Sequence, residues 1–341
     1  MSNRWPGGLI RKTPVTPTGP YQTGAASGVW SLADASYWLK QGLWPIAGNI
    51  QDGTFAIFAL GNNTCTRNKY TYSGCVSSSA TAGTVVSSGQ SAAGNSTVGI
   101  FALGFSSTFC GCSVVTTRNK YTYVGCVVSA GGAATVPSYD GSAAGNSTVG
   151  IFALGYDSGA NRLATRNKYT YSGDVVSAGG AATTASYVGS AVGNSTRGIF
   201  ALGCAGSTVT TRDKYTYSGC VVSAGGAATV ASDRGSATGN STIGIFALGR
   251  NACNTNLTTR DKYTYSSDVV SAGGAATVAS RGSAAAGNST VGIFALGATP
   301  TASTTRNKYT YSGCVVAAAT ASTAVSQRGS AASNGIIGVT L

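Results

Sequence analysis

The sequence predicts an all-β protein whose main body is a six-bladed β-propeller of four-stranded blades. Three observations lead to this prediction: a unit that occurs six times, four strand-like segments within each unit, and a composition rich in glycine but poor in charge. Glycine accounts for 49 of the 341 residues and charged residues for 9%, as is typical of β-rich, turn-rich proteins. Each unit carries one phenylalanine and one arginine: Phe58, Phe101, Phe152, Phe200, Phe246 and Phe294, with Arg67, Arg118, Arg166, Arg212, Arg260 and Arg306.

The second unit shows the expected strands. Residues 98–103 form an almost continuous apolar run, as expected for a strand covered on both faces. Residues 118–123 alternate, so that Arg118, Lys120 and Thr122 point one way and the residues between them point the other. A weaker strand of small residues follows at 127–130. The Gly-Ser-Ala-Ala segment at 141–144 is the strand that opens the next unit.

The two ends of the repeat region predict how it closes. The first unit begins directly with the apolar strand at 54–60, whereas residues 329–335 supply an extra copy of the Gly-Ser-Ala-Ala segment. We therefore expect a C-terminal strand to complete the first blade and close the ring. Residues 336–341 resemble a shortened apolar strand, and their packing is not assigned. An open solenoid fibre is the alternative architecture.

Strand direction sorts the connections onto two faces. One face carries the loops that differ between copies, and the other carries turns that are nearly constant. The Gly-Asn-Ser-Thr segments at 94, 145, 193, 239 and 287 belong to the constant face. They also match a glycosylation signal, but we interpret them as tight turns stabilised by their own side chains.

Residues 1–48 form a separate segment before the propeller of residues 49–341. Closely spaced prolines predict an extended arm, and the pattern at 32–41 predicts one short amphipathic helix. We expect this segment to insert into a partner, because aromatic side chains dominate binding energies at interfaces. A helix that simply docks on its own repeat body is the alternative. The predicted anchor residues are Trp5, Trp30, Trp38, Leu39 and Trp44.

The residue types argue against an enzyme. The chain has no histidine and only nine acidic residues, all of them aspartate, which leaves no Ser-His-Asp or Cys-His set. We expect no cofactor and no metal site. No apolar run is long enough for a membrane span or a secretory signal, so neither export by that route nor membrane insertion is expected.

The net charge of +13 comes mainly from the repeats. One arginine and one lysine in each of six units supply 12 of the 22 basic residues. They could form a track for nucleic acid with tyrosines that stack bases. We favour a ring between blades in which the basic side chains pack their stems and reach carbonyl groups or aspartates, and we expect no nucleic-acid partner.

Nine cysteines fall into two groups. Cys75, Cys126, Cys220 and Cys314 occupy one repeat position, which is aspartate in two copies, Asp174 and Asp268. Whole-repeat rotations separate these cysteines too far for disulfides, so free thiols are expected. The others lie in variable loops, where a strained Cys110–Cys112 bridge is conceivable: Cys65, Cys110, Cys112, Cys204 and Cys253.

Two parts of the chain resemble known virion proteins. The head resembles the N-terminal module of tailed-phage virion proteins, notably of cyanophages, in the segments Ser2–Ile10, Ala26–Leu32 and Tyr37–Pro45. The repeats resemble the kelch-like units of phage tail-fibre and adhesin proteins, although the kelch double glycine appears here only as Leu-Gly. This resemblance implies a virion appendage attached through its N-terminus, with its repeat body exposed.

These expectations combine into one hypothesis. Residues 1–48 attach the protein to other virion proteins in multiple copies per virion, and the variable loops bind a host-surface glycan through multivalent weak contacts. A carbohydrate-binding propeller lectin with one pocket between each pair of blades, and a purely structural decoration protein, are the alternatives. The candidate receptor-facing residues are Phe105, Phe109, Tyr139, Tyr156, Tyr187, Arg234, Arg250 and Arg281.

Overall fold

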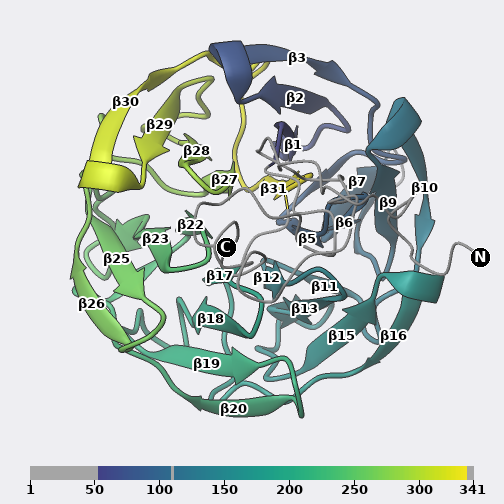
Figure 1. The fold of residues 1–341 in the computed structure, drawn as a ribbon. Helices are drawn as coiled ribbons and strands as arrows, with labels where there is room; N and C mark the ends of the chain where they lie inside the picture. The colour runs from purple at the N-terminus through teal and green to yellow at the C-terminus, as the bar shows by residue number, and fades with distance from the viewer. Residues whose placement is uncertain (1–52, 109–110, 336–341) are drawn as a thin grey trace, which may run out of the picture. The chain divides into compact units, whose positions relative to one another are not determined.

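The computed structural model describes residues 53–108 and 111–335. Strands dominate these residues, and most belong to six four-stranded antiparallel sheets, here called sheets 1 to 6. In Figure 1 the sheets lie side by side around a common centre, in a propeller-like arrangement. The predicted arm at 1–48, with its helix at 32–41, lies outside the described residues, as do residues 336–341.

Sheets 1 to 3 take their strands almost entirely in chain order, from innermost to outermost. Sheet 1 contains β31 (Ser330–Ser333), β1 (Phe55–Ala59), β2 (Arg67–Thr71) and β3 (Val76–Ala80). Sheet 2 contains β5 (Ser91–Gly94), β6 (Val98–Ala102), β9 (Arg118–Thr122) and β10 (Val127–Gly131). Sheet 3 contains β12 (Ser142–Gly145), β13 (Val149–Ala153), β15 (Arg166–Thr170) and β16 (Val175–Ala178).

Sheets 4 to 6 repeat the same order. Sheet 4 contains β17 (Ser190–Gly193), β18 (Arg197–Ala201), β19 (Arg212–Thr216) and β20 (Val221–Ala224). Sheet 5 contains β22 (Ser236–Gly239), β23 (Ile243–Ala247), β25 (Arg260–Thr264) and β26 (Val269–Ala272). Sheet 6 contains β27 (Ala284–Gly287), β28 (Val291–Ala295), β29 (Arg306–Thr310) and β30 (Val315–Ala319).

Short elements occupy the connections. The small strands are β4 (Ser87–Ser88), β7 (Phe105–Thr108), β8 (Gly111–Val114), β11 (Ser138–Tyr139), β14 (Tyr156–Asp157), β21 (Ser232–Asp233) and β24 (Arg250–Asn251). Single 3-10 turns precede four of the outermost strands: η1 (Ser73–Cys75), η2 (Val124–Cys126), η3 (Ser172–Asp174) and η4 (Ser312–Cys314). No helix among the described residues is long and apolar enough to cross a membrane.

The first sheet joins both ends of the repeat region, as the sequence predicts. The C-terminal strand β31 pairs antiparallel with β1, with Ala331 opposite Phe58. The strand therefore takes the place that the preceding Gly-Ser-Ala-Ala segment takes in every other unit. The innermost strands also contact one another in succession, β5 with β12 and so on to β27 with β31, and β31 contacts β5.

Apolar packing occurs between neighbouring sheets. The second strand of each sheet is buried along nearly its whole length, as predicted, and its isoleucine faces the next sheet while its phenylalanine faces the previous one. Ile100 of sheet 2, for example, packs with Phe152 and Tyr169 of sheet 3. Each pair of neighbouring sheets therefore shares one hydrophobic core, and we call this contact a junction.

A buried arginine crosses each junction. The six repeat arginines are about 1% exposed, although the lysine two residues later on the same strand is only half-buried. The guanidinium of Arg118 lies 4.5 Å from the centre of the Phe152 ring. Its Nη2 donates to Asn167 Oδ1 of sheet 3 at 3.0 Å. The same contacts run from Arg306 of sheet 6 to Phe58 and Asn68 of sheet 1.

The residue after the arginine is asparagine in four units and aspartate in two. A neighbouring threonine hydroxyl forms a hydrogen bond with either side chain. Asn119 donates through Nδ2 to Thr84 Oγ1 at 2.9 Å. Asp213 instead accepts from Thr183 Oγ1, at 2.6 Å. Because a hydroxyl can donate or accept, the same geometry accommodates either side chain. Aspartate adds a buried ion pair, since Asp213 lies 2.8 Å from Nη2 of Arg166 and both side chains are 0% exposed.

The Gly-Asn-Ser-Thr segments are tight turns, as predicted, and they also connect the sheets. Asn95 Oδ1 accepts from the backbone N–H groups of Thr97 and Val98 at 2.9 and 3.0 Å. The other end of the same side chain, Nδ2, donates to the carbonyl of Ser147 in the next unit's turn. Both ends of the asparagine are therefore engaged, which favours the turn interpretation over a glycosylation site.

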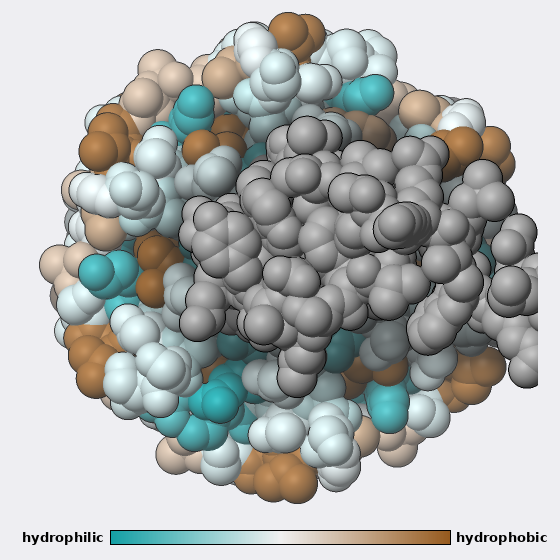
Figure 2. Space-filling view, in the orientation of Figure 1, coloured by the Kyte–Doolittle hydropathy of each residue, from teal (hydrophilic) through white to brown (hydrophobic). Residues whose placement is uncertain are grey.

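The outermost strands run around the periphery and each approaches the next sheet closely. Their first valines are more than half exposed, and Figure 2 shows hydrophobic residues spaced around this rim. A Cβ on Gly132 would lie 2.3 Å from the carbonyl oxygen of Asp174, so a side chain there would force the two segments apart. Threonine replaces this glycine on both sides of sheet 1: Thr81 donates to the carbonyl of Cys126, and Thr320 to that of Cys75.

The junction arginines should differ in their contribution to stability according to their partner. We expect Arg166→Met to cost about 3–5 kcal/mol, because it leaves Asp213 as a buried carboxylate without its cation. Arg118→Met leaves only the neutral Asn167 and should cost about 1–3 kcal/mol. Urea unfolding of both variants measures the difference, and equal losses would contradict the role of charge.

Asp213→Asn is the matched control for this comparison. It converts an ion-paired junction into the type that four other units already use, so we expect a loss below about 1.5 kcal/mol. In the Asp213→Asn background, Arg166→Met should then cost no more than Arg118→Met does alone.

The buried tyrosines predict unfolding at alkaline pH. Burial raises the pKa of Tyr121 to about 12 and places that of Tyr123 well above its ordinary value. Because the unfolded chain ionises near pH 10, the stabilisation from these groups is complete below about pH 10 and is lost above it. Burial lowers the pKa of Arg118 to about 10, which acts in the opposite direction. In the described part of the chain, twelve buried tyrosines outnumber the six junction arginines, so the tyrosine effect is the larger.

A phenolate absorbance titration followed together with circular dichroism tests this expectation. Most tyrosines should ionise only as the sheets unfold. Complete ionisation near pH 10 with the sheets intact would contradict it.

Candidate binding face

The variable loops gather on one face, as the sequence predicts. Three small ribbons join a loop inside one unit to the connection that precedes that unit: β4 with β7, β11 with β14 and β21 with β24. In two other units, single β-bridges join the loop to the preceding connection, between Tyr187 and Cys204 and between Arg281 and Ala298. We call this side of the sheets the loop face.

A chain of backbone hydrogen bonds crosses the loop face from sheet to sheet. Each member donates to the carbonyl of the member in a neighbouring connection, over 2.7 to 2.9 Å, and the chain returns to its start. All six members have positive φ, from 49° to 65°. The order of donors is Gly89, Arg328, Gly282, Arg234, Val188, Asp140 and again Gly89. Positive φ at Val188 is a strained conformation for a β-branched residue, and such strain is found most often at functional sites.

On this face, the side chains differ most between units at two neighbouring positions of the repeat. One position directly precedes the residue of each unit that belongs to the chain of hydrogen bonds. The other directly follows the Leu-Gly that ends each apolar strand. The two positions lie opposite each other in five units, and no two of these five pairs are alike. The pairs are Ser88 with Phe105, Tyr139 with Tyr156, Tyr187 with Cys204, Asp233 with Arg250, and Arg281 with Ala298.

Four of the predicted receptor-facing residues form a continuous row of aromatic rings. The ring centres of Phe105 and Tyr139 are 6.0 Å apart, those of Tyr139 and Tyr156 are 5.6 Å apart, and those of Tyr156 and Tyr187 are 3.9 Å apart. All four side chains are half-buried. A hydrogen bond with Tyr156, together with burial, raises the pKa of Tyr187. We call these four residues the aromatic row.

The predicted arginines lie beyond the aromatic row. Arg250 forms a two-pronged ion pair with Asp233, through Nε at 3.2 Å and Nη2 at 3.0 Å, and this hydrogen bonding raises the pKa of Arg250. Arg281 donates to Asn256 Oδ1 at 3.1 Å. Arg234 belongs to the chain of hydrogen bonds. The loop face is therefore aromatic over sheets 2 to 4 and rich in polar and charged groups over sheets 4 to 6.

Sequence reasoning missed an ion pair across this face. Arg328 donates to both carboxylate oxygens of Asp140, which is 8% exposed, although 188 residues separate the two in the chain. Gly89 lies between them, and a Cβ there would stand 2.8 Å from Asp140 Oδ1. The sequence offers one signal for this ion pair: Asp140 and Arg328 occupy the same position in their repeat units.

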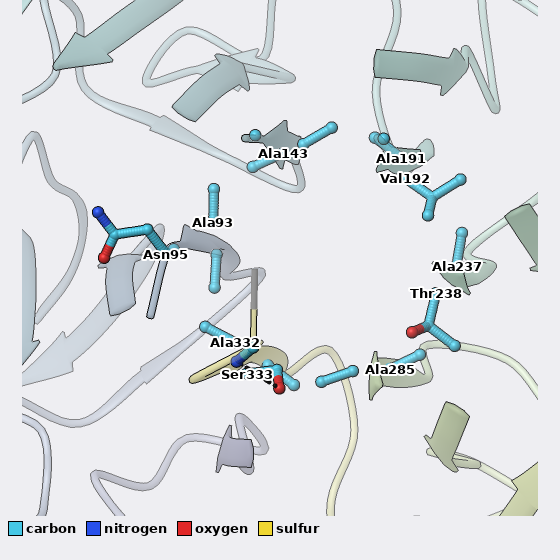
Figure 3. Close-up of a pocket in the computed structure, with 18 of the residues that line it drawn as sticks. Ala93, Asn95, Ala143, Ala191, Val192, Ala237, Thr238, Ala285, Ala332 and Ser333 are labelled. Carbon is cyan, nitrogen blue, oxygen red and sulfur yellow. Dashed lines mark hydrogen bonds between the residues drawn. The ribbon is translucent and has the colours of Figure 1, made fainter. Parts of the chain in front are cut away.

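The spaces at the centre and between the sheets are small. A pocket of about 90 Å³ lies at the centre and is lined by side chains of the innermost strands, mainly alanines, with Val192, Thr238 and Ser333 (Figure 3). The spaces between neighbouring sheets are about 10 Å³, room for about one water molecule. Among the described residues, no group of three or more cysteine and aspartate side chains could hold a metal ion.

Several predicted residues lie outside the described residues. These are Phe109 and all the anchor residues, Trp5, Trp30, Trp38, Leu39 and Trp44. The side chains of Cys110 and Cys112 are also not described, so the bridge between them stays a prediction. The described cysteines of the repeat position are free thiols, as expected.

Comparison with known proteins adds no assignment. No protein-family model matches the chain, and no curated protein matches it significantly.

Proposed function

We propose that this protein is a non-enzymatic virion appendage that binds a host-surface glycan through its loop face. Residues 1–48 attach it to other virion proteins, and the repeat body is a closed six-bladed propeller. The return of the hydrogen-bond chain to Gly89, the pairing of β31 with β1 and the contact of Arg306 with Phe58 support closure. The resemblance of the head to phage virion modules supports the attachment.

The binding proposal rests on one observation: the side chains vary most between units at positions that do not contribute to the junctions. The junction residues repeat in every unit because each fills the same buried space. Each of the five pairs on the loop face contains a different combination of side chains. A face of this kind suits one extended ligand with different groups along its length.

The aromatic row and its polar neighbours fit a glycan. The rings of Tyr139, Tyr156 and Tyr187 can stack on the C–H surfaces of sugar rings, and the hydroxyl of Tyr139 can add a hydrogen bond beside the one that joins Tyr156 to Tyr187. Arg250, Asp233 and Asn256 provide planar donors and acceptors for sugar hydroxyls beyond the row.

The same geometry modifies the expected binding mode. The aromatic contacts gather over sheets 2 to 4 instead of repeating around the ring, so we propose one asymmetric site in place of six weak equivalent ones. A lectin with one pocket between each pair of blades is disfavoured, because the junction arginine and phenylalanine leave only about 10 Å³ there.

The aromatic row gives the direct test of glycan binding. We expect the full-length protein to bind on a glycan array, and Tyr156→Ser and Tyr187→Ser each to weaken binding about tenfold, since removing an aromatic anchor costs about 1–2 kcal/mol. Ala298→Ser is the control, because Ala298 occupies the same position as Tyr156 in sheet 6 and lies outside the row. Equal losses in all three variants, or no binding by the parent protein, would refute the proposal.

Attachment through the N-terminal segment has its own test. We expect particles that express the protein without residues 1–48 to lack it, and particles that express Trp5→Ala, Trp38→Ala and Trp44→Ala together to carry less of it. Quantitative mass spectrometry of purified particles measures the content. Normal incorporation of the truncated protein would show that the attachment lies elsewhere.

A further inference from the structure

The repeat position at the start of the outermost strand presents an unusual mixture of residues. Four copies are cysteine and two are aspartate, yet all six have the same backbone conformation, with φ between 53° and 55°. The four thiols are partly exposed. The members are Cys75, Cys126, Asp174, Cys220, Asp268 and Cys314. We call this position the Cys/Asp column.

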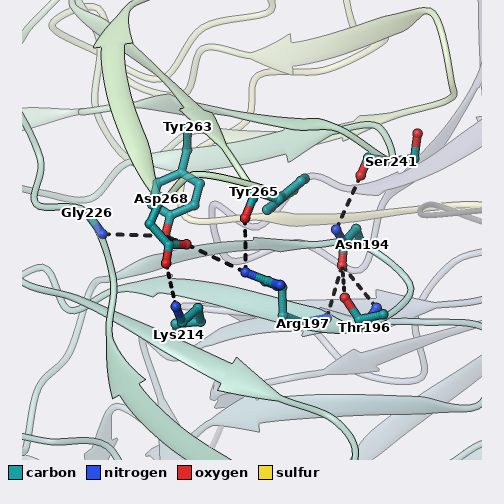
Figure 4. Close-up of polar contacts among 9 residues, drawn as sticks. All are labelled: Asn194, Thr196, Arg197, Lys214, Gly226, Ser241, Tyr263, Tyr265 and Asp268. Atoms are coloured by element: carbon teal, nitrogen blue, oxygen red, sulfur yellow. Dashed lines mark hydrogen bonds and ion pairs between the residues drawn. The ribbon is translucent and has the colours of Figure 1, made fainter. Parts of the chain in front are cut away.

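The aspartate copies show what the position binds. Figure 4 shows that Asp268 accepts from the hydroxyl of Tyr263 at 2.7 Å and from the ammonium group of Lys214 in the preceding sheet. Asp174 accepts equivalently from Tyr169 at 2.7 Å and Lys120 at 2.8 Å. Burial works against ionisation, but these donors outweigh it and lower the pKa of both carboxyl groups. The position therefore holds an anion.

The same surroundings recur at Cys220 and Cys314. The tyrosine hydroxyl accepts a glycine N–H at the aspartate copies, from Gly132 and Gly226, at 3.3 and 3.4 Å. It does so again at the cysteine copies, from Gly180 to Tyr215 at 3.4 Å and from Gly274 to Tyr309 at 3.3 Å. The lysines that correspond to Lys120 and Lys214 are Lys168 and Lys262.

The other two cysteines lack part of this arrangement. Thr320 and Thr81 replace the glycine beside Cys75 and Cys126. The hydroxyl groups of Tyr70 and Tyr121 are fully buried there and have no hydrogen-bond partner. Burial raises the pKa of both tyrosines, and the neighbouring thiol adds to this effect. A buried hydroxyl without an acceptor is costly, so an oxygen added to the sulfur would satisfy it.

We propose that the cysteines of the Cys/Asp column are sites of peroxide oxidation, and that the oxidised sulfur occupies the anion position that a carboxylate occupies at Asp174 and Asp268. A sulfinate presents two oxygens on one atom, as a carboxylate does. One can accept from the tyrosine hydroxyl and the other from the lysine.

The chemistry requires only a peroxide as oxidant. The sulfur of the thiol forms a bond to one peroxide oxygen as the O–O bond breaks, and the departing hydroxide takes the thiol proton to give water. The product is a sulfenic acid. A second peroxide molecule adds a second oxygen in the same way, releases a second water and yields the sulfinic acid, which is ionised at neutral pH.

Neighbouring lysines allow a test within one molecule. We expect hydrogen peroxide to convert Cys220 and Cys314 of the full-length protein to sulfinate faster than the exposed loop residue Cys253, as measured by peptide mass spectrometry. Lys262→Met should slow oxidation at Cys314 at least about threefold and leave Cys220 unchanged, because a nearby cation favours the anionic sulfur. Lys120→Met, which faces Asp174, should slow neither. Faster oxidation of Cys253, or an unchanged rate at Cys314, would overturn the proposal.

A substitution series tests the anion position without oxidation. Cys314→Asp should raise the thermal unfolding midpoint above that of Cys314→Asn, because only the aspartate can pair with Lys262 as Asp268 pairs with Lys214. The asparagine has nearly the same shape, so the comparison isolates the charge. An equal or higher midpoint for Cys314→Asn would show that the position does not favour an anion.

Discussion

The architecture depends on a charged side chain buried in every junction. Each guanidinium lies flat against a phenylalanine of the next sheet, and one nitrogen reaches an asparagine or aspartate beyond it. The Nε of all six arginines has no hydrogen-bond partner. Contact with the ring face compensates part of this loss, because the aromatic quadrupole attracts a cation strongly where water is absent. The contact fixes both the spacing and the rotation of neighbouring sheets, since a shift of either would break the contact with the ring and the hydrogen bond beyond it.

This constraint explains where the chain can vary. The residues that contribute to the junctions recur with few substitutions. They are the phenylalanine, the arginine, the asparagine or aspartate, the threonine and the second glycine of the Gly-Gly pair. The exceptions are exchanges that preserve the contact, such as aspartate for asparagine with the threonine hydroxyl reversed. None of the paired positions of the loop face belongs to a junction core. Aromatic, ionic and small side chains can therefore replace one another there without loss of the sheets, and this freedom produces the asymmetric face.

Sequence alone predicted the features that repeat along the chain. The period, the four strands per unit, the pairing of the C-terminal segment with the first unit and the gathering of variable loops on one face follow from patterns within single units. It also predicted that the repeat arginines reach carbonyl groups or aspartates between sheets, as Arg166 does at Asp213. It did not identify Asn167 as a partner of Arg118, because the alternation along one strand gives no information about contacts with another sheet. The hydrogen-bond chain through Val188 and the Asp140–Arg328 pair were also missed, since both join units that are distant in sequence. The aromatic row was partly predicted, because its members were recognised as exposed but not as neighbours.

The Cys/Asp column shows how internal repetition can reveal what a position binds. In a protein without repeats, Cys314 would be a half-buried thiol with no assigned role. Here Asp268 shows the same backbone position with a carboxylate in place, and its donors identify the space as one suited to an anion. The comparison needs no second structure, because the copies share one backbone conformation and, at Cys220 and Cys314, the same contact between a tyrosine hydroxyl and a glycine N–H. Differences among copies are therefore as informative as their similarity: shared donors define the site, and the changing acceptor shows which chemical groups the site can accommodate.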